Sequence, residues 1–191
     1  MTVQERIAKS VEQKVWRFRV SDFLVLVERG SFADYARAEL LDGEIWTLNA
    51  IHSRHAGVQA ELQGQLWETL RRIGSNLQSY VAPSVAISDT SLPEPDLTIA
   101  EPHDQGFLPR EKVRLVIEIA DTTLDIDLGR KLRLYASAGV PEYWMADVNA
   151  RSIHQMWAPT EETYAEHREL PFGAPIVSAT IVNFTIATDG L

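Results

Sequence analysis

The sequence predicts an α/β (α+β) fold, a mixed central β-sheet flanked by helices, with a hairpin and a helix as an N-terminal extension. Residues 113–120 read VRLVIEIA, an apolar run typical of a strand covered on both faces. Residues 58–73 and 122–139 carry apolar side chains at helical spacing. Short β-type runs bounded by turn residues surround these two stretches, which indicates strands on both sides of each helix.

The N-terminal extension is expected to contain two helices and a hairpin. Three apolar residues spaced by four within the first 14 residues predict a short amphipathic helix. The stretch DFLVLVER predicts a second helix, with Ser21 as its N-cap and Gly30 just past its end. Apolar segments on both sides of Asp42-Gly43, a dipeptide favoured in type I′ turns, predict a hairpin over residues 36–49.

The two longer helices are expected to cover the sheet. The apolar stripe of the first consists of Val58, Leu62, Leu66, Leu70 and Ile73, with Gly74 at its end. The stripe of the second consists of Leu128, Leu132 and Tyr135, with Gly139 at its end.

The remaining strands are short. SYVAPSVAIS and PDLTIA are β-type runs, and Pro83 argues against one continuous central strand in the first of them. EPHDQGFLPREK is expected to be a loop. EYWMADV and SIHQMWA predict two strands around the turn Asn149-Ala150, and the tail from Thr160 is expected to supply edge strands.

Composition indicates a single domain over residues 1–191 of a soluble, cytoplasmic protein. The chain has 191 residues, 45% hydrophobic and 24% charged, as in ordinary globular domains. It has no apolar run long enough to span a membrane, no signal-peptide core, and no cysteine for disulfides or thiolate metal sites. The net charge of −9 argues against a nucleic-acid partner, although a local basic rim can serve an otherwise acidic protein.

Two carboxylates stand out in the central strands. Asp96 opens an apolar strand directly after a proline, and Glu118 lies inside VRLVIEIA. An ionised carboxylate there loses hydration worth roughly several kcal/mol, so it requires a cation, a donor or a shared proton. Alternation groups Glu118 with Val116 and Ala120, and Asp96 with Thr98 and Ala100, so that one face of the sheet can carry both acids. Such a pair suits Mg²⁺, or Mn²⁺, which one or two carboxylates hold together with water and substrate phosphate oxygens.

Lys131 is the candidate cation for the chemistry, since its helix directly follows the Glu118 strand. Asp127 and Tyr135 flank it at i−4 and i+4. Metal-assisted phosphodiester hydrolysis requires carboxylates for the ion and a lysine that orients the water or stabilises transition-state charge.

Each of these residues also fits a purely structural role. Asp127 and Lys131 fit a surface ion pair, Asp96 fits a turn cap, and Glu118 fits a structural contact. His52 and His55, at the start of the first long helix, fit two imidazoles at a site, or a cap and a core histidine.

These residues carry a resemblance to a known family. ELLDGEI, a histidine before the first long helix, PDL, LVIEIA, DxxxK and LYASAGVPEYW together resemble the Uma2 family, a domain of unknown function (DUF820) grouped with restriction endonucleases. The resemblance covers a core of about residues 20–185. It implies the PD-(D/E)XK nuclease superfamily, with a restriction-endonuclease-like core and Mg²⁺-dependent cleavage of DNA. Asp96 and Glu118 match the acids of that pattern.

One position departs from the superfamily pattern. Ala120 stands where the superfamily has lysine, and the resemblance implies that Lys131 takes its place. The resemblance also implies that Glu39 is an acidic position of the family that reaches the same site.

We therefore expect a Mg²⁺-dependent endonuclease, with Asp96 and Glu118 on the metal, Lys131 as the catalytic cation, and Glu39, His55, Asp127 and Tyr135 in support. The alternatives are a non-catalytic module of the same fold that binds a protein partner, and a metal-dependent hydrolase of another substrate. A homodimer and possible DNA binding are further expectations. The basic residues expected to form a rim are Arg110, Lys112, Arg114, Arg130, Lys131 and Arg133.

Overall fold

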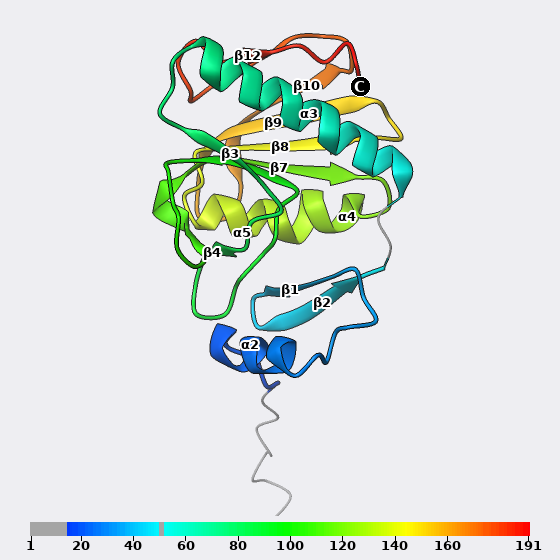
Figure 1. The fold of residues 1–191 in the computed structure, drawn as a ribbon, viewed down its shortest axis with the longest axis vertical. Helices are drawn as coiled ribbons and strands as arrows, with labels where there is room; N and C mark the ends of the chain where they lie inside the picture. The colour runs from blue at the N-terminus through cyan, green and yellow to red at the C-terminus, as the bar shows by residue number, and fades with distance from the viewer. Residues whose placement is uncertain (1–14, 50–51) are drawn as a thin grey trace, which may run out of the picture.

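The structure, a computed structural model, describes residues 15–49 and 52–191. The helix expected in the first 14 residues lies outside this range. A six-stranded sheet in the order β10-β9-β8-β7-β5-β3 forms the centre of the molecule (Figure 1). In that order the strands are Tyr164–Pro171, Ser152–Pro159, Glu142–Asp147, Val113–Ala120, Leu97–Ala100 and Gln78–Val81. β7 and β8 run parallel and the other neighbours antiparallel, so the predicted mixed sheet is confirmed.

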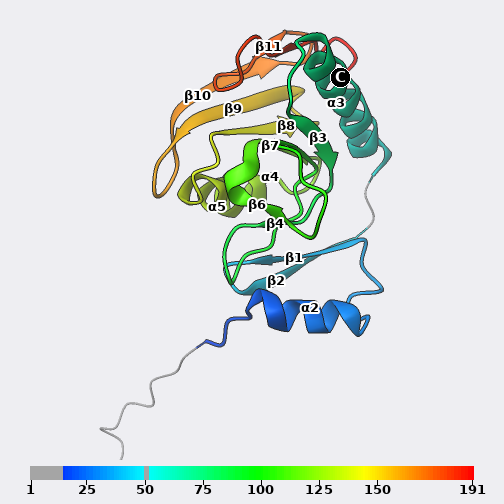
Figure 2. The same cartoon turned by 60° about the vertical axis from the view of Figure 1, so that its left-hand side comes forward.

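Helices cover both faces of this sheet (Figures 1 and 2). One face carries α3 (Ser53–Arg72), and the other carries α4 (Leu124–Ile126), the π-helical turn η2 (Asp127–Lys131) and α5 (Leu132–Ser137). None of the helices described is long and apolar enough to cross a lipid bilayer.

The alternation along β7 assigns its side chains to the two faces. Leu115, Ile117 and Ile119 pack in one buried cluster with Leu62 and Leu66 of α3. Val116 and Ala120 pack in the other cluster, with Tyr135 of α5. Glu118 therefore stands on the α5 face, between two apolar neighbours.

The N-terminal layer consists of α2 (Val20–Glu28) and the hairpin of β1 (Arg37–Leu41) and β2 (Glu44–Leu48). In Figure 2 the hairpin lies between α2 and the rest of the molecule. Asp42 and Gly43 have φ values of 52° and 76°, as the predicted type I′ turn requires. A Cβ on Gly43 would also lie 2.5 Å from Cβ of Arg17, so this turn needs glycine for space as well as conformation. The hairpin prediction is confirmed.

Local predictions for the chain before β7 need two corrections. Ser21 is not the N-cap of α2; Arg19 is, because the Asp22 carboxylate accepts a hydrogen bond from the Arg19 backbone N–H at 3.1 Å. The loop over residues 101–112 contains β6 (Leu108–Pro109), which pairs in parallel with β4 (Val85–Ala86), and a 3₁₀ turn, η1 (Arg110–Lys112).

Two further corrections concern the second half. The helix predicted over residues 122–139 is interrupted by η2, whose wider turn spaces side chains differently from an α-helix. β10 is an edge strand as predicted, whereas β11 (Ile176–Val177) and β12 (Thr185–Ile186) pair with each other.

A buried carboxylate attaches this C-terminal hairpin to the sheet. Glu142 of β8 is fully buried, and both of its oxygens accept hydrogen bonds. The donors are Nε1 of Trp144, Nε2 of Gln155, the backbone N–H of Ala179, and the hydroxyls of Ser178 and Thr180 with the Thr180 backbone N–H. One side chain thus fixes the segment between β11 and β12.

Candidate functional site

The antiparallel register of β5 and β7 brings Asp96 and Glu118 together. Leu97 lies opposite Ile117, so Asp96, one residue before β5, lies opposite Glu118. Oδ2 of Asp96 accepts a hydrogen bond from the Ile119 backbone N–H at 2.8 Å. Both acids are at most 3% exposed and line a cavity of about 280 Å³ between the sheet, η2 and the hairpin.

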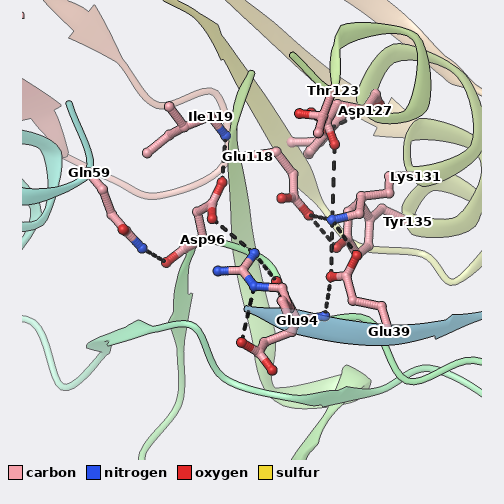
Figure 3. Close-up of polar contacts among 12 residues, drawn as sticks. Glu39, Gln59, Glu94, Asp96, Glu118, Ile119, Thr123, Asp127, Lys131 and Tyr135 are labelled. Atoms are coloured by element: carbon pink, nitrogen blue, oxygen red, sulfur yellow. Dashed lines mark hydrogen bonds and ion pairs between the residues drawn. The ribbon is translucent and has the colours of Figure 1, made fainter. Parts of the chain in front are cut away.

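Lys131 bridges the acids from the sheet and the hairpin (Figure 3). Its Nζ lies 3.0 Å from Oε1 of Glu118, 3.0 Å from Oε2 of Glu39 and 4.0 Å from Oδ1 of Asp127. The Tyr135 hydroxyl donates to the same Oε1 of Glu118 at 2.7 Å. The structure therefore places Glu39, Glu118, Asp127, Lys131 and Tyr135 in one buried network.

The π-helical turn η2 supplies Asp127 and Lys131 to this network. Lys131 is its last residue and Tyr135 lies one turn further on in α5, so both side chains reach Glu118 from the same helical stretch. Asp127 is held by the Thr123 hydroxyl, which donates to Oδ2 at 2.6 Å. Single π-helical turns of this kind often occur at functional sites.

Asp96 has a separate set of partners. Nη1 of Arg37 lies 3.0 Å from Oδ1 of Asp96, and Nε2 of His55 lies 3.1 Å from Oδ2. Arg37 also contacts the Glu94 carboxylate through Nε at 3.2 Å. Oε1 of Glu39 accepts a hydrogen bond from the Glu94 backbone N–H at 2.7 Å. Strand β1 thus contributes to the surroundings of both acids of the sheet. Arg37 pairs with Asp96, and Glu39 pairs with Lys131, which in turn pairs with Glu118.

Sequence reasoning missed Arg37 and Glu94. The signal for Arg37 was present, because Arg37 and Glu39 are two residues apart in a strand and therefore share a face. Glu94 lies in a connection without periodicity, and nothing in the pattern indicates its contact with Arg37. Of the two histidines, His55 joins the buried network, whereas the largely exposed His52 pairs with Asp121 at 3.0 Å where it lines the cavity.

The basic residues expected to form a rim are mostly elsewhere. Arg114 pairs with Glu101, and Nζ of Lys112 donates to the Pro102 carbonyl at 2.9 Å, near the start of β7 rather than at Glu118. Arg130 pairs with Glu44 at 2.8 Å, on the hairpin. Among the residues that line the cavity, the Lys and Arg side chains are those of Arg37 and Lys131.

The pKa values of the two strand acids are shifted in opposite directions. Burial by itself raises the pKa of Asp96, but the hydrogen bond from His55 and the charge of Arg37 outweigh it, so this pKa lies below its usual value. Burial raises the pKa of Glu118 well above its usual value, and the opposing charge of Lys131 does not cancel the effect. The surroundings therefore stabilise the ionised form of Asp96 more than that of Glu118, whose charge depends on Lys131.

The pKa values of the two helix residues, Lys131 and Asp127, are both raised, for different reasons. Burial disfavours the charged form of Lys131, but the charges of Glu118, Glu39 and Asp127 outweigh it and raise its pKa above the usual value. Burial raises the pKa of Asp127 to about 6, against the opposing charge of Lys131. Lys131 stays charged, and the surrounding carboxylates outnumber the cations that neutralise them.

The donor set suits a hard divalent cation. Carboxylate oxygens are the ligands that Mg²⁺ prefers, and Oε2 of Glu118 makes none of the hydrogen bonds found within residues 15–49 and 52–191. In the same residues no three His, Asp or Glu side chains are arranged around one point as ligands. We attribute this to Lys131 and Arg37, which lie among the carboxylates. The residue types fit the ion, and the two cations neutralise the acids in part in this arrangement.

Comparison with known proteins gives a consistent assignment. Residues 20–189 match the family model described as "Uma2: Putative restriction endonuclease". A search of curated proteins finds no match. Among solved structures, a "putative nuclease belonging to DUF820" from Anabaena variabilis ATCC 29413 matches with a TM-score of 0.68 and 13% identity, over 91% of this chain and 96% of that one. At this identity the likeness shows the fold, and it confirms the expected nuclease-like architecture.

Proposed function

The chain belongs to the Uma2 family, whose model matches residues 20–189, and from this premise we propose that it is a Mg²⁺-dependent endonuclease that hydrolyses DNA phosphodiester bonds. The observation that carries the proposal is the buried network around Glu118. Asp96 and Glu118 come from neighbouring strands, line one cavity, and are accompanied there by Lys131. A network of ionisable side chains with shifted pKa values in a cavity is typical of an active site.

Each side chain has a role that its contacts support. Asp96 and Glu118 would hold the cation, which when bound polarises the phosphate and acidifies a water. Lys131 stabilises negative charge on the phosphoryl group or orients the water. Tyr135 and Glu39 position Glu118 and Lys131 through their direct hydrogen bonds. His55 holds the orientation of the Asp96 carboxylate.

Arg37 extends the site toward the substrate. Its Nε and Nη1 contact Glu94 and Asp96, while Nη2 makes none of the contacts found among the described residues. Because Arg37 lines the cavity, this group is available to a phosphate oxygen, and a guanidinium binds phosphate well.

The decisive experiment combines metal binding with plasmid nicking. Asp96→Asn and Glu118→Gln remove one charge each while keeping the shape of the side chain. We expect both to abolish Mn²⁺ binding measured by calorimetry and to lower the nicking rate roughly 100-fold or more. Glu101→Gln makes the same charge change outside the cavity, and this control should leave both measurements unchanged. Nicking that survives both cavity substitutions would contradict the proposal.

One observation favours a second candidate, a non-catalytic module that binds a protein partner. Arg37 and Lys131 already lie beside Asp96, Glu39 and Glu118, so the network is neutralised in part without a metal. If the purified protein binds no divalent cation and nicks no DNA, this second candidate replaces the first.

A further inference from the structure

The cavity has an acidic floor and an apolar wall. The floor consists of Asp96, Glu118 and Lys131, all at most 3% exposed. The wall consists of Trp46, Leu48 and Ile126, which also line the cavity and are half-buried. Trp46 and Leu48 are two residues apart in β2, so they stand on the same face of the hairpin. A ligand that fills this space therefore meets both charged and apolar side chains.

Trp46 is fixed in place by its neighbours. The Arg130 guanidinium lies 5.0 Å from the centre of the indole ring, and Arg130 is itself paired with Glu44 at 2.8 Å. The indole also packs against the cluster of buried residues around Tyr135. Arg130 does not line the cavity, so Trp46 presents a different part of its surface there. A fixed aromatic side chain is suited to stacking against a planar group.

On the premise of the nuclease function proposed above, we propose that the cavity accepts an unpaired nucleotide, with the phosphate at the acidic floor and the base against Trp46. The substrate is accordingly single-stranded DNA rather than an intact duplex. This assigns Trp46 as a substrate-binding residue.

The burial of the acids supports this choice. In a duplex the bases are stacked inside, and the phosphates lie on a broad convex surface that does not fit a cavity of about 280 Å³. Enzymes that take up a base in a pocket use single strands or extrude the nucleotide, at a cost in unpairing. An unpaired nucleotide enters without that cost and brings its base to the apolar wall.

The charge of the chain supports the same choice. Duplex binding depends largely on many Lys and Arg contacts to phosphates, and this chain has a net charge of −9 with few cations at the cavity. Stacking on an aromatic side chain contributes to binding for any base and does not require a basic surface.

Binding of fluorescent oligonucleotides by the full chain tests the proposal without catalysis. With Ca²⁺, a hard cation that carboxylates also bind, in place of Mg²⁺, fluorescence anisotropy compares one sequence as a single strand and as a blunt duplex, and gel electrophoresis checks that the oligonucleotide stays uncut. We expect the single strand to bind roughly tenfold or more tightly. Trp46→Leu should weaken single-strand binding roughly 5- to 100-fold, whereas Trp46→Phe, which keeps an aromatic ring, should retain most of it.

Trp67→Leu is the matched control. Trp67 is an exposed tryptophan of α3 that also carries a stacked arginine, Arg71, but it does not line the cavity. Its substitution should leave the affinity unchanged. Equal affinity for single strand and duplex, or equal losses in Trp46→Leu and Trp67→Leu, would overturn the proposal, provided that circular dichroism shows Trp46→Phe to be folded.

Cleavage separates this inference from the function on which it rests. With Mn²⁺, the single strand should be cut roughly tenfold or more faster than the duplex of the same sequence. A protein that cuts the duplex at least as fast would keep the nuclease assignment and overturn the single-strand preference. A protein that cuts neither but binds the single strand through Trp46 would lose the nuclease assignment and keep the binding mode.

Discussion

At the scale of single residues, Lys131 determines the charge state of the buried network. Its ammonium lies between Glu39 and Glu118, and all three side chains are at most 4% exposed. Moving an unpaired ion into such surroundings costs roughly several kcal/mol, so each carboxylate depends on the lysine for compensation. This dependence makes the network sensitive to removal of either partner.

Lys131→Met is expected to lower the free energy of unfolding by about 3–5 kcal/mol, because it leaves two buried carboxylates without their cation. Urea denaturation at neutral pH measures the change. The double variant Lys131→Met/Glu118→Gln should recover part of the loss, since it removes one of the unpaired charges. An unchanged urea midpoint in Lys131→Met would contradict the described ion pairs.

The raised pKa of Asp127 predicts how the stability of the fold changes with pH. Burial raises the pKa of Asp127 to about 6 in the folded protein, so the folded state keeps a proton that the unfolded chain has already lost. Its contribution to stability is therefore lost as the pH rises from about 4 to about 6. Asp127→Asn keeps an acceptor for Thr123 and removes the titration.

Asp127→Asn should accordingly match the wild type near pH 4 and exceed its unfolding free energy above pH 6 by on the order of 1–3 kcal/mol. Urea denaturation at several pH values measures this difference. Asp125→Asn, two residues earlier and exposed, is the control and should show no such trend. A difference that is constant with pH would contradict the raised pKa.

The sequence predicts the acids of the site better than their partners. Asp96 and Glu118 are conspicuous because a charged group in an apolar strand requires compensation. The compensating cations come from other segments, Arg37 from the hairpin and Lys131 from the helix, and the hairpin adds a third acid, Glu39. Alternation assigns these side chains to a face, but the packing of the hairpin against the sheet depends on tertiary contacts that no local pattern records. The roles of these residues in catalysis stay predictions.

At the scale of elements, periodicity predicts most of the fold. The hairpin, α3, β7 and β8 are found where apolar spacing and turn residues place them. The π-helical turn was not predicted, because its one extra residue changes the spacing by less than the scatter of apolar positions. The short pairs β4–β6 and β11–β12 have two residues in each strand, too few for alternation to indicate a strand.

Glu142 of β8 accepts the hydrogen bonds of the segment between the two strands of the C-terminal hairpin, which gives a prediction for this element. Glu142→Gln replaces an acceptor oxygen by a donor that faces other donors, so we expect a loss of about 2–4 kcal/mol in unfolding free energy. Hydrogen exchange should become faster in residues 176–186. Glu162→Gln, at an exposed loop position, is the control and should change neither measurement. Unchanged exchange in Glu142→Gln would show that the hairpin is held by its apolar contacts instead.

At the scale of the whole molecule, the net charge of −9 limits how DNA can be bound. Proteins that neutralise many phosphates lose affinity steeply as salt is added, by about 0.7 per phosphate in the logarithmic slope for single strands. Here the cations at the cavity are few, and the proposed contact includes a base.

The affinity for single-stranded DNA should therefore depend weakly on salt, with a logarithmic slope between about −1 and −2. Anisotropy titrations over a series of NaCl concentrations measure this slope. Trp46→Leu should lower the affinity without changing the slope, because it removes stacking and leaves the phosphate contacts intact. A slope steeper than about −5 would indicate an extended basic surface that the described residues do not form at the cavity.

The single domain and the homodimer remain predictions at this scale. One cooperative urea transition, seen by two different probes, is expected for a single domain. Sedimentation velocity distinguishes a dimer from a monomer directly.

The geometry of the site depends on the number of residues in the π-helical turn η2. An α-helix rotates by about 100° per residue, so removing one residue from η2, for example Gly129, would turn Thr123 and Asp127 by that angle relative to Lys131 and Tyr135. Every side chain would remain the same, yet the two halves of the helical stretch would no longer face Glu118 together. In this segment a single deletion is therefore a larger change than most substitutions. It rotates one pair of site residues relative to the other and leaves the chemistry of each side chain unchanged.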